Sequence, residues 1–120
     1  MNSESVWDKL HRFNDIIVKV EHVWREYDVD TEIVKAKLVF TDGTNLRVSE
    51  SFIDGQLVSY SYYWLNESNQ LIIGCDNAPH HRNVETFPHH KHVGTKTSVK
   101  SSKERCLKDV LSFIRRVLEG

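Results

Sequence analysis

The sequence predicts a single α+β domain of two layers, in which an antiparallel meander sheet of about five strands carries a helix from each end of the chain on one face. Apolar residues recur with helical spacing at both ends and alternate with polar residues in between. Two Asp-Gly pairs separate the alternating segments. A length of 120 residues with 39% hydrophobic residues suits one domain with a modest core. Residues 1–120 are therefore interpreted as that domain.

The first predicted helix occupies the N-terminal segment and gives way to a strand. Apolar residues recur at helical spacing from Val6 to Ile17, and Ser5 followed by Asp8 forms a possible capping box. From Ile16 the pattern alternates, which is typical of a strand with one buried face. The residues predicted on the apolar face of this strand are Val18, Val20, His22 and Trp24.

Two further strands are predicted on either side of a tight turn. The apolar face of the second strand consists of Val34, Ala36, Leu38 and Phe40. Asp42-Gly43 follows it and suits a type I′ hairpin turn, because glycine tolerates a positive φ. The third strand is predicted over residues 45–53, and Asp54-Gly55 after it indicates a second hairpin of the same kind.

The fourth and fifth strands complete the predicted sheet. The fourth alternates from Val58 to Trp64, and residues 67–70 are polar enough for a turn. A short apolar strand then runs from Leu71 and ends at Gly74. Because turns this short cannot carry a parallel crossover, neighbouring strands are predicted to pair antiparallel.

The closing segment is predicted to be the second helix. Ser101 with Glu104 forms a possible capping box in front of an apolar stripe that would face the sheet. The residues of this stripe are Leu107, Val110, Leu111, Ile114, Val117 and Leu118. Residues 76–100, between the sheet and this helix, show no clear period and are interpreted as a loop.

The composition favours a cytoplasmic protein that does not enter a membrane. No run of roughly 18 apolar residues is present, so no spanning helix is expected. The N-terminal segment also lacks the basic and then apolar pattern of a secretion signal. Cys75 and Cys106 form no CxxC-type pair and are expected to be free and packed.

The net charge of −1 conceals an asymmetry along the chain. Residues 1–78 carry 7 Lys or Arg against 13 Asp or Glu, whereas residues 79–116 carry 9 against 3. A basic segment suits an anionic partner such as RNA or an acidic antitoxin peptide, although the two halves could equally neutralise each other in the fold.

Five of the seven histidines lie within thirteen residues, in two groups that each follow a proline. The first group is Pro79-His80-His81 and the second is Pro88-His89-His90-Lys91-His92. Imidazoles titrate near neutral pH, and loops held by a rigid sheet commonly carry chemistry. This loop is therefore the candidate functional site.

The stretch GCDNAPHHRNVETFPHHKHVG, with its paired DNAPHH and TFPHHKH motifs, resembles the signature of the TumE family of toxins. The preceding segments LRVSE and YSYYW agree with that family in order and spacing, and the resemblance covers roughly residues 30–95. It implies a prokaryotic type II toxin, encoded beside a small helix-turn-helix antitoxin and directed at RNA. The site residues that it implies are Arg47, Glu50, Tyr60, Tyr62, Asp76, Asn77, His80, His89, His90 and His92.

The first hypothesis is a small metal-independent endoribonuclease without a cofactor. Such an enzyme needs one group to accept the 2′-hydroxyl proton and another to protonate the leaving oxygen, and imidazole can serve in either role. His80 and His90 could divide this work, and His92 shares strand parity with His90. Arg47 or Lys91 could stabilise the negative charge at phosphorus. The predicted catalytic residues are His80, His89, His90, His92, Arg47 and Glu50.

Two other functions and a structural interpretation stay open. Asp76, His80, His90 and His92 supply the three nitrogens and one oxygen that tetrahedral zinc accepts, which would make the protein a zinc-dependent hydrolase. A non-catalytic module could instead bind RNA, a metal or a partner through the same loop. The histidines could also be purely structural. Asp76 and Asn77 could close a turn through their side chains and so aim His80 and His81.

The strands contribute further candidates. Glu50 shares parity with apolar neighbours, so it is predicted to be a covered carboxylate with an Arg or His partner, unless a bulge turns it outward. Tyr60 and Tyr62 could stack on RNA bases or belong to the core, and Lys91 and Asn77 are the other predicted RNA contacts. Tyr63 faces the other way and could form a homodimer contact. The basic run, which could track phosphates or simply be solvated, is Lys96, Lys100, Lys103 and Arg105.

Overall fold

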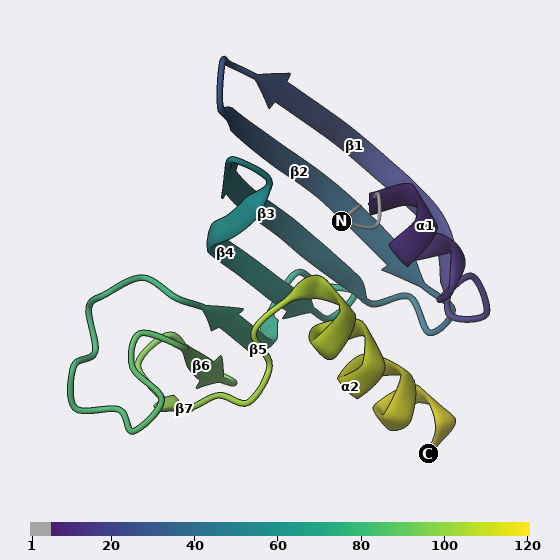
Figure 1. Ribbon diagram of the computed structural model, residues 1–120. Helices are drawn as coiled ribbons and strands as arrows, with labels where there is room; N and C mark the ends of the chain where they lie inside the picture. Colours follow the sequence, from purple (N-terminus) through teal and green to yellow (C-terminus); the bar gives the residue numbers. More distant parts are fainter. Residues whose placement is uncertain (1–5) are drawn as a thin grey trace.

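One antiparallel sheet forms the centre of the computed structural model, which describes residues 6–120 (Figure 1). Seven strands follow one another across the sheet in the order β1-β2-β3-β4-β5-β6-β7. The elements are α1 (Val6–His11), β1 (Ile17–Tyr27), β2 (Thr31–Phe40), β3 (Asn45–Ile53), β4 (Gln56–Leu65), β5 (Leu71–Asp76), β6 (His90–Val93), β7 (Val99–Ser101) and α2 (Leu107–Glu119). The predicted meander of five strands is confirmed, and two short strands extend it.

The two extra strands come from the segment that was interpreted as a loop. β6 pairs with β5 over four residues, and β7 pairs with β6 over three. Segments this short do not show a recognisable alternation, because a strand pattern needs several repeats. The predicted shared face of His90 and His92 is nevertheless confirmed, since both lie in β6 and are two residues apart.

β1 departs from the predicted alternation because it contains a bulge. Val20 lies opposite the buried Leu38, but the register shifts between Glu21 and Trp24, and His22 has a φ of 54°. Two residues of β1, His22 and Val23, lie opposite the single residue Ala36, so β1 has one extra residue before pairing resumes with Trp24 opposite Lys35. The prediction that Trp24 lies on the apolar face with Val20 is therefore wrong, and its side chain is 48% exposed.

The two predicted hairpins differ in detail. Asp54-Gly55 is a two-residue turn with φ angles of 50° and 78°, as the type I′ prediction requires. At Asp42-Gly43 only the glycine has a positive φ, 88°, and the connection is wider. There the Asp42 carboxylate accepts hydrogen bonds from the Thr44 backbone N–H at 3.0 Å and from its hydroxyl at 2.6 Å.

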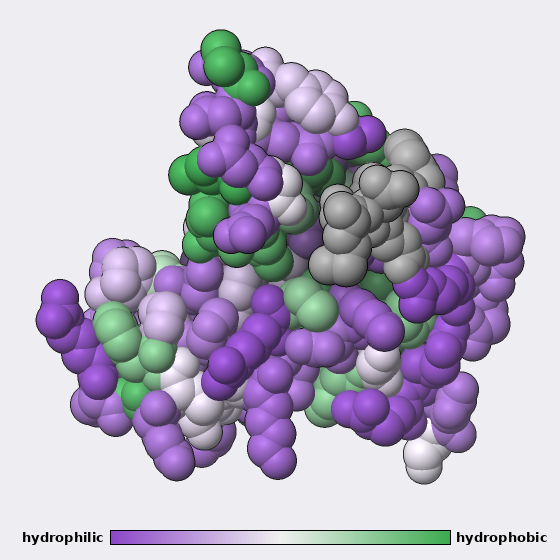
Figure 2. All heavy atoms as spheres, in the orientation of Figure 1, coloured by the Kyte–Doolittle hydropathy of each residue, from purple (hydrophilic) through white to green (hydrophobic). Residues whose placement is uncertain are grey.

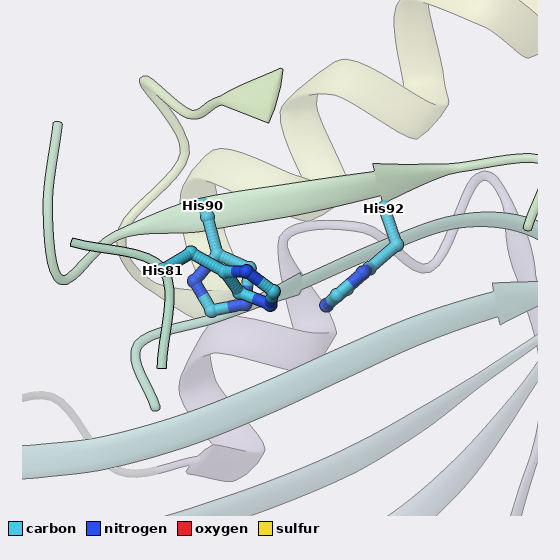
Figure 3. Close-up of side chains that lie close together, drawn as sticks. All are labelled: His81, His90 and His92. Atoms are coloured by element: carbon cyan, nitrogen blue, oxygen red, sulfur yellow. The ribbon is translucent and has the colours of Figure 1, made fainter. Parts of the chain in front are cut away.

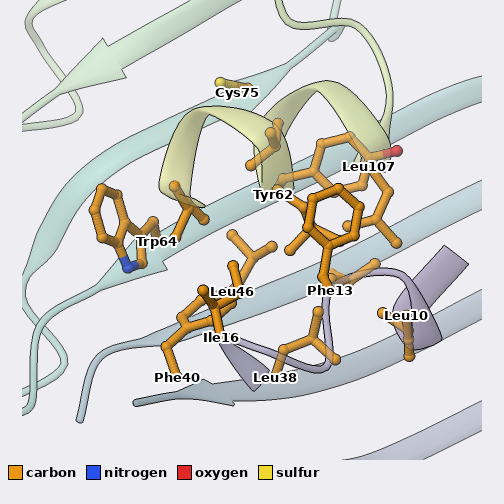
Figure 4. Close-up of a cluster of buried hydrophobic side chains, with 14 of the residues drawn as sticks. Leu10, Phe13, Ile16, Leu38, Phe40, Leu46, Tyr62, Trp64, Cys75 and Leu107 are labelled. Atoms are coloured by element: carbon orange, nitrogen blue, oxygen red, sulfur yellow. The ribbon is translucent and has the colours of Figure 1, made fainter. Parts of the chain in front are cut away.

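Both helices lie on the same face of the sheet, as predicted (Figure 1). Leu10 of α1 and Phe13 after it lie in one core cluster with the sheet residues Leu38 and Leu46 (Figure 4). Leu111 and Ile114 of α2 belong to the same cluster. Cys75 lies in this core, and both cysteines are free, as expected. We call this side of the sheet the covered face and the other side the open face.

The helix boundaries differ from the predictions. α2 begins at Leu107, and its N-cap Cys106 makes no side-chain capping bond, so the predicted Ser101–Glu104 box is wrong. Ser101 belongs to β7 instead, and the Glu104 carboxylate contacts the Lys91 ammonium at 3.3 Å. The Asp109 carboxylate accepts a hydrogen bond from the Arg105 backbone N–H. The predicted Ser5 cap of α1 lies outside the described residues.

The surface on the helix side is mainly hydrophilic over α2, and hydrophobic residues gather over the turns that join β1 to β2 and β3 to β4 (Figure 2). Val29, between β1 and β2, is 99% exposed, and Ile53 at the end of β3 is 45% exposed. Neither helix in the described part of the chain has the length and apolar character that a membrane crossing requires.

Candidate functional site

Strand alternation places a polar set of side chains on the open face. Ser49 on β3 lies opposite Ser61 on β4, and Ser61 lies opposite Asp76 on β5. Asp76 in turn lies opposite His90 on β6. Because residues directly opposite each other share a face, these four side chains form one row across the sheet.

His81, His90 and His92, which we call the histidine cluster, meet at the β6 end of this row (Figure 3). His90 and His92 extend from β6, and His81 reaches them from the loop between β5 and β6. One ligand atom from each lies within 4.8 Å of the other two. The His90 ring centroid is 4.8 Å from that of His81 and 4.8 Å from that of His92. His90 and His92 are buried, and His81 is half-buried.

One buried carboxylate, that of Asp76, contacts two of these histidines. The Nε2 atom of His90 lies 2.9 Å from Oδ1 of Asp76, and the Nε2 atom of His92 lies 3.3 Å from Oδ2. Asp76 also accepts hydrogen bonds from the Tyr63 hydroxyl at 3.1 Å and from the Ala78 backbone N–H at 3.0 Å. The last bond confirms that Asp76 closes the turn after β5.

The other ring nitrogens of the two buried histidines face backbone carbonyls. Nδ1 of His90 lies 3.0 Å from the Pro88 oxygen, and Nδ1 of His92 lies 2.8 Å from the Lys96 oxygen. A carbonyl can only accept a hydrogen bond, so each Nδ1 carries the proton that it donates. The orientation of both rings and the identity of the atom that faces Asp76 are thereby fixed.

Gly74 allows Tyr63 to take its place beside the histidine cluster. Gly74 lies between Tyr63 on β4 and His92 on β6. A Cβ atom at position 74 would lie 2.4 Å from Cδ1 of the Tyr63 ring, which is closer than side chains approach. The ring therefore lies directly over the glycine, and it meets His92 edge-on. Burial and the neighbouring Asp76 carboxylate raise the pKa of the Tyr63 hydroxyl to about 12, so it remains a hydrogen-bond donor at neutral pH.

Two hollows adjoin on the open face and form one groove. The first, of about 650 Å³, is lined by residues of β1 to β4 that include Trp24, Lys35 and Arg47. The second, of about 710 Å³, contains Asp76, His81, His90 and His92, with His80 among its other lining residues. The two hollows share Ser49, Ser61 and Tyr63. We call this continuous depression the open-face groove.

The first hollow combines cations with an exposed aromatic ring. Within residues 6–120, Lys35 forms no ion pair, and Arg47 donates from Nε to the Asn45 side-chain oxygen at 3.0 Å without pairing with a carboxylate. Lys37 lies 3.5 Å from the Glu21 carboxylate. Two cations without a carboxylate partner in the described part of the chain, beside the exposed Trp24 ring, suit an anionic ligand with aromatic parts.

Of the residues predicted to be catalytic, the structure brings His90 and His92 together and places Arg47 along the same groove. His80 lines the second hollow with an exposed side chain. The position beside His90 and His92 that was predicted for His80 is occupied by His81. His89 lies apart, with Nδ1 2.8 Å from the Tyr60 hydroxyl and its ring stacked on that of Tyr60. Burial, followed by the charges of Arg105 and His90, lowers the pKa of His89.

The side chains of Glu50, Tyr60 and Tyr62 lie on the covered face, although Tyr60 also borders the second hollow. The predicted burial of Glu50 is confirmed at 2% exposure, but its partner is the Tyr62 hydroxyl at 2.6 Å and not an Arg or His. Tyr60 and Tyr62 are 5% and 0% exposed, so their rings are core residues that no RNA base can reach. Burial raises the pKa of Glu50 and, more strongly, that of Tyr62.

The remaining predicted contacts also have structural partners. The Asn77 side chain accepts from the Tyr60 backbone N–H at 3.0 Å and donates to the Val58 oxygen at 3.0 Å, so it ties the loop to β4. Lys91 points to the covered face, towards Glu104. The predicted basic run is exposed and lines neither hollow; its residues are Lys96, Lys100, Lys103 and Arg105.

Several groove residues were absent from the predicted site, among them His81, Tyr63, Trp24 and Lys35. Parity in β4 already separated Tyr63 from Tyr60 and Tyr62, so the alternation could have placed it on the face of Ser61. For His81 no pattern was available, because the loop between β5 and β6 has no period. Trp24 was misplaced by the bulge in β1.

The family model described as Toxin TumE matches residues 8–118, from α1 to α2. The resemblance found in the histidine motifs is thereby confirmed and extends to nearly the full chain. No curated protein and no solved structure matches the chain.

Proposed function

The chain belongs to the family of TumE toxins, and on this premise we propose that it is the toxin of a toxin–antitoxin pair and cleaves single-stranded RNA as a small endoribonuclease. A helix-turn-helix antitoxin is the expected partner. The observation that supports RNA as the target is the open-face groove, where cations that pair with no carboxylate among residues 6–120 and an exposed aromatic ring adjoin a group of imidazoles.

The first hollow supplies what a single strand needs for binding without a fixed sequence. Lys35 and Arg47 would contact phosphates, and the exposed face of Trp24 would stack on a base. Stacking of this kind contributes about 1–3 kcal/mol per base. The small side chains of Ser49 and Ser61 form the floor between the two hollows, so a strand held in the first hollow continues towards the histidine cluster.

The second hollow holds the groups for the reaction. In RNA cleavage the 2′-oxygen attacks the adjacent phosphorus, its proton passes to a base, and the departing 5′-oxygen takes a proton from an acid. The products are a 2′,3′-cyclic phosphate and a 5′-hydroxyl end. His80, which is exposed at the rim, is assigned to the proton of the departing oxygen. The 2′-hydroxyl proton would pass to a basic group at the floor, where Asp76 and the histidine cluster lie. Arg47, which lines the adjoining first hollow, is assigned to the charge at phosphorus.

The test is cleavage of a mixed single-stranded RNA by the purified protein, with and without EDTA. His80→Ala and Arg47→Ala are expected to lower the cleavage rate by roughly 10²-fold or more, because each removes a group that acts on the reacting phosphate. His89→Ala is the matched control, since its ring lies against Tyr60 and lines neither hollow. It should cleave at close to the wild-type rate.

The outcomes separate the hypotheses. Cleavage that survives EDTA would mean that side chains carry out both proton transfers. This is the outcome that the hypothesis of a metal-independent enzyme predicts. Cleavage that stops with EDTA and returns with zinc would mean that the reaction depends on an ion held in the second hollow, which would supply Lewis acidity there. No cleavage by folded wild-type protein that still binds RNA would overturn the nuclease and leave a toxin that acts by occupancy.

A further inference from the structure

In the histidine cluster, several hydrogen-bond acceptors face one another without a donor between them. Because Nδ1 of His90 and of His92 each donates to a carbonyl, a neutral ring presents its Nε2 lone pair on the other side. Both lone pairs then face the Asp76 carboxylate, at 2.9 and 3.3 Å, although a carboxylate is also an acceptor. Such an arrangement is stable only with positive charge between these atoms.

The histidine cluster is enclosed, since His90 is 2% exposed and His92 is 7% exposed. The ring of His81, 4.8 Å from that of His90, would add a third imidazole to the same small volume. One divalent cation bound by neutral imidazoles meets the same electrostatic need without charging any ring.

We propose that His81, His90, His92 and Asp76 bind one divalent transition-metal ion, and zinc is the ion that the ligands fit best. Three imidazole nitrogens and one carboxylate oxygen form a set that tetrahedral zinc accepts. Two ligand atoms that are each about 2.1 Å from a tetrahedral ion lie roughly 3.4 Å apart. The separation of 3.3 Å between His92 and Asp76 is close to this value, and the three histidines already lie within 4.8 Å of one another.

The surroundings of the four ligands are those of a metal site. A histidine that binds metal through one nitrogen commonly donates from the other to a backbone carbonyl, as His90 and His92 do. A binding carboxylate is held by hydrogen bonds of its own, and Asp76 receives them from Tyr63 and Ala78. The site opens into the second hollow, so the ion can enter and can meet a ligand there.

This inference goes beyond the proposed function, because the four ligands and their hydrogen-bond partners are all residues of this chain and the site does not require RNA. If RNA is the substrate, the ion lies where the scissile phosphate would arrive. The proposed ligand set differs from one sequence-based alternative, in which His80 and not His81 was the third histidine. The two neighbours therefore provide a matched pair for the test.

The experiment is a zinc titration of protein that carries no histidine tag, after dialysis against EDTA and without RNA. Wild-type protein is expected to bind one ion per chain, and His81→Ala should weaken binding by about 100-fold or more, beyond what loss of an outer partner costs. His80→Ala should bind like wild-type protein. His81→Gln is a second variant, and circular dichroism verifies that each variant is folded.

A second measurement uses the thermal midpoint. Zinc is expected to raise the midpoint of the wild-type and His80→Ala proteins and to leave that of His81→Ala unchanged, since only the folded site binds the ion. Equal weakening by His80→Ala and His81→Ala, or wild-type binding no tighter than that of His81→Ala, would overturn the site. Zinc binding without RNA cleavage would keep the site and remove the nuclease, whereas cleavage without zinc binding would do the reverse.

Discussion

The two faces of the sheet use adjacent residues of the same strands for opposite purposes. Tyr62 on β4 is fully buried on the covered face, where it donates to Glu50. Tyr63, the next residue, lies over Gly74 on the open face and donates to Asp76. The same contrast separates buried Leu46 from exposed Arg47 on β3.

Each face also holds one buried carboxylate, and the two differ in their partners. Among the described residues, Glu50 has one side-chain donor, the Tyr62 hydroxyl, and it is 2% exposed. Asp76 has a hydroxyl and a backbone donor and, in addition, two imidazole nitrogens turned towards it. One hydrogen bond from a tyrosine is enough for a carboxylate that is only buried in a core. Asp76 instead gathers groups that can hold a ligand, which indicates that the covered face provides stability and the open face provides the site.

The largest expected effect separates the faces at the pair Leu46 and Arg47. Leu46→Ala should lower the free energy of unfolding by about 2–5 kcal/mol, because a fully buried leucine is replaced by a cavity. Arg47→Ala should change it by roughly 0.5 kcal/mol or less, because the side chain is exposed. Urea unfolding measures both values. Affinity for single-stranded RNA should show the opposite order, and equal losses of stability would contradict the division between faces.

The two tyrosines give a finer test with the same substitution at neighbouring positions. Tyr62→Phe removes the one side-chain donor that the described part of the chain gives to a buried carboxylate, and it should cost about 1–3 kcal/mol of unfolding free energy. Tyr63→Phe should cost less, since Asp76 keeps its other partners, but it should weaken zinc binding about tenfold. Chemical unfolding and zinc titration are measured on both variants. A Tyr62→Phe protein with normal stability and weakened zinc binding would reverse the assignment.

Much of the fold could be predicted because its signals are local. The Asp54-Gly55 turn requires two positive φ angles that few other residue pairs adopt, and alternation along β2 to β4 identified the covered face. The errors lie where contacts between distant parts of the chain, and not the local sequence pattern, determine the structure. The bulge at His22 leaves no trace in the alternation, and β6 and β7 exist only because β5 offers them an edge.

The site was predictable as a segment but not as an arrangement. The histidine motifs identified the loop, yet nothing in a segment without period tells which of His80 and His81 turns inward. The alternation along β3 contained information that the prediction did not use. Arg47 and Glu50 are three residues apart in a regular strand, so they must face opposite sides and cannot share one site.

A smaller effect is expected from the glycine that lies between the two rings of the site. Gly74→Ala would place a methyl group against the Tyr63 ring, which must then move away from Asp76. We expect a loss of about 1–3 kcal/mol at most from this overpacking, and zinc binding weakened as in Tyr63→Phe. In a Tyr63→Ala background the methyl group meets no ring, so the same substitution should have little further effect on either measurement. Additive losses would show that Gly74 acts independently of Tyr63.

The smallest change concerns the charge of Glu50, and its effect is a dependence on pH. Burial raises the pKa of Glu50, although the Tyr62 hydroxyl and Lys9 oppose the shift. A carboxyl whose pKa is higher in the folded state stabilises the fold at low pH, and this contribution is lost as pH rises from its unfolded pKa through its folded one. Glu50→Gln keeps the acceptor for Tyr62 and cannot ionise. Its unfolding free energy relative to wild-type protein should therefore increase as pH rises above 4.5, the ordinary pKa of a glutamate. Urea unfolding of both proteins from acidic to neutral pH measures this difference. A difference that does not change with pH would mean that Glu50 ionises as freely in the core as in the unfolded chain, and the covered face would then tolerate charge as the open face does.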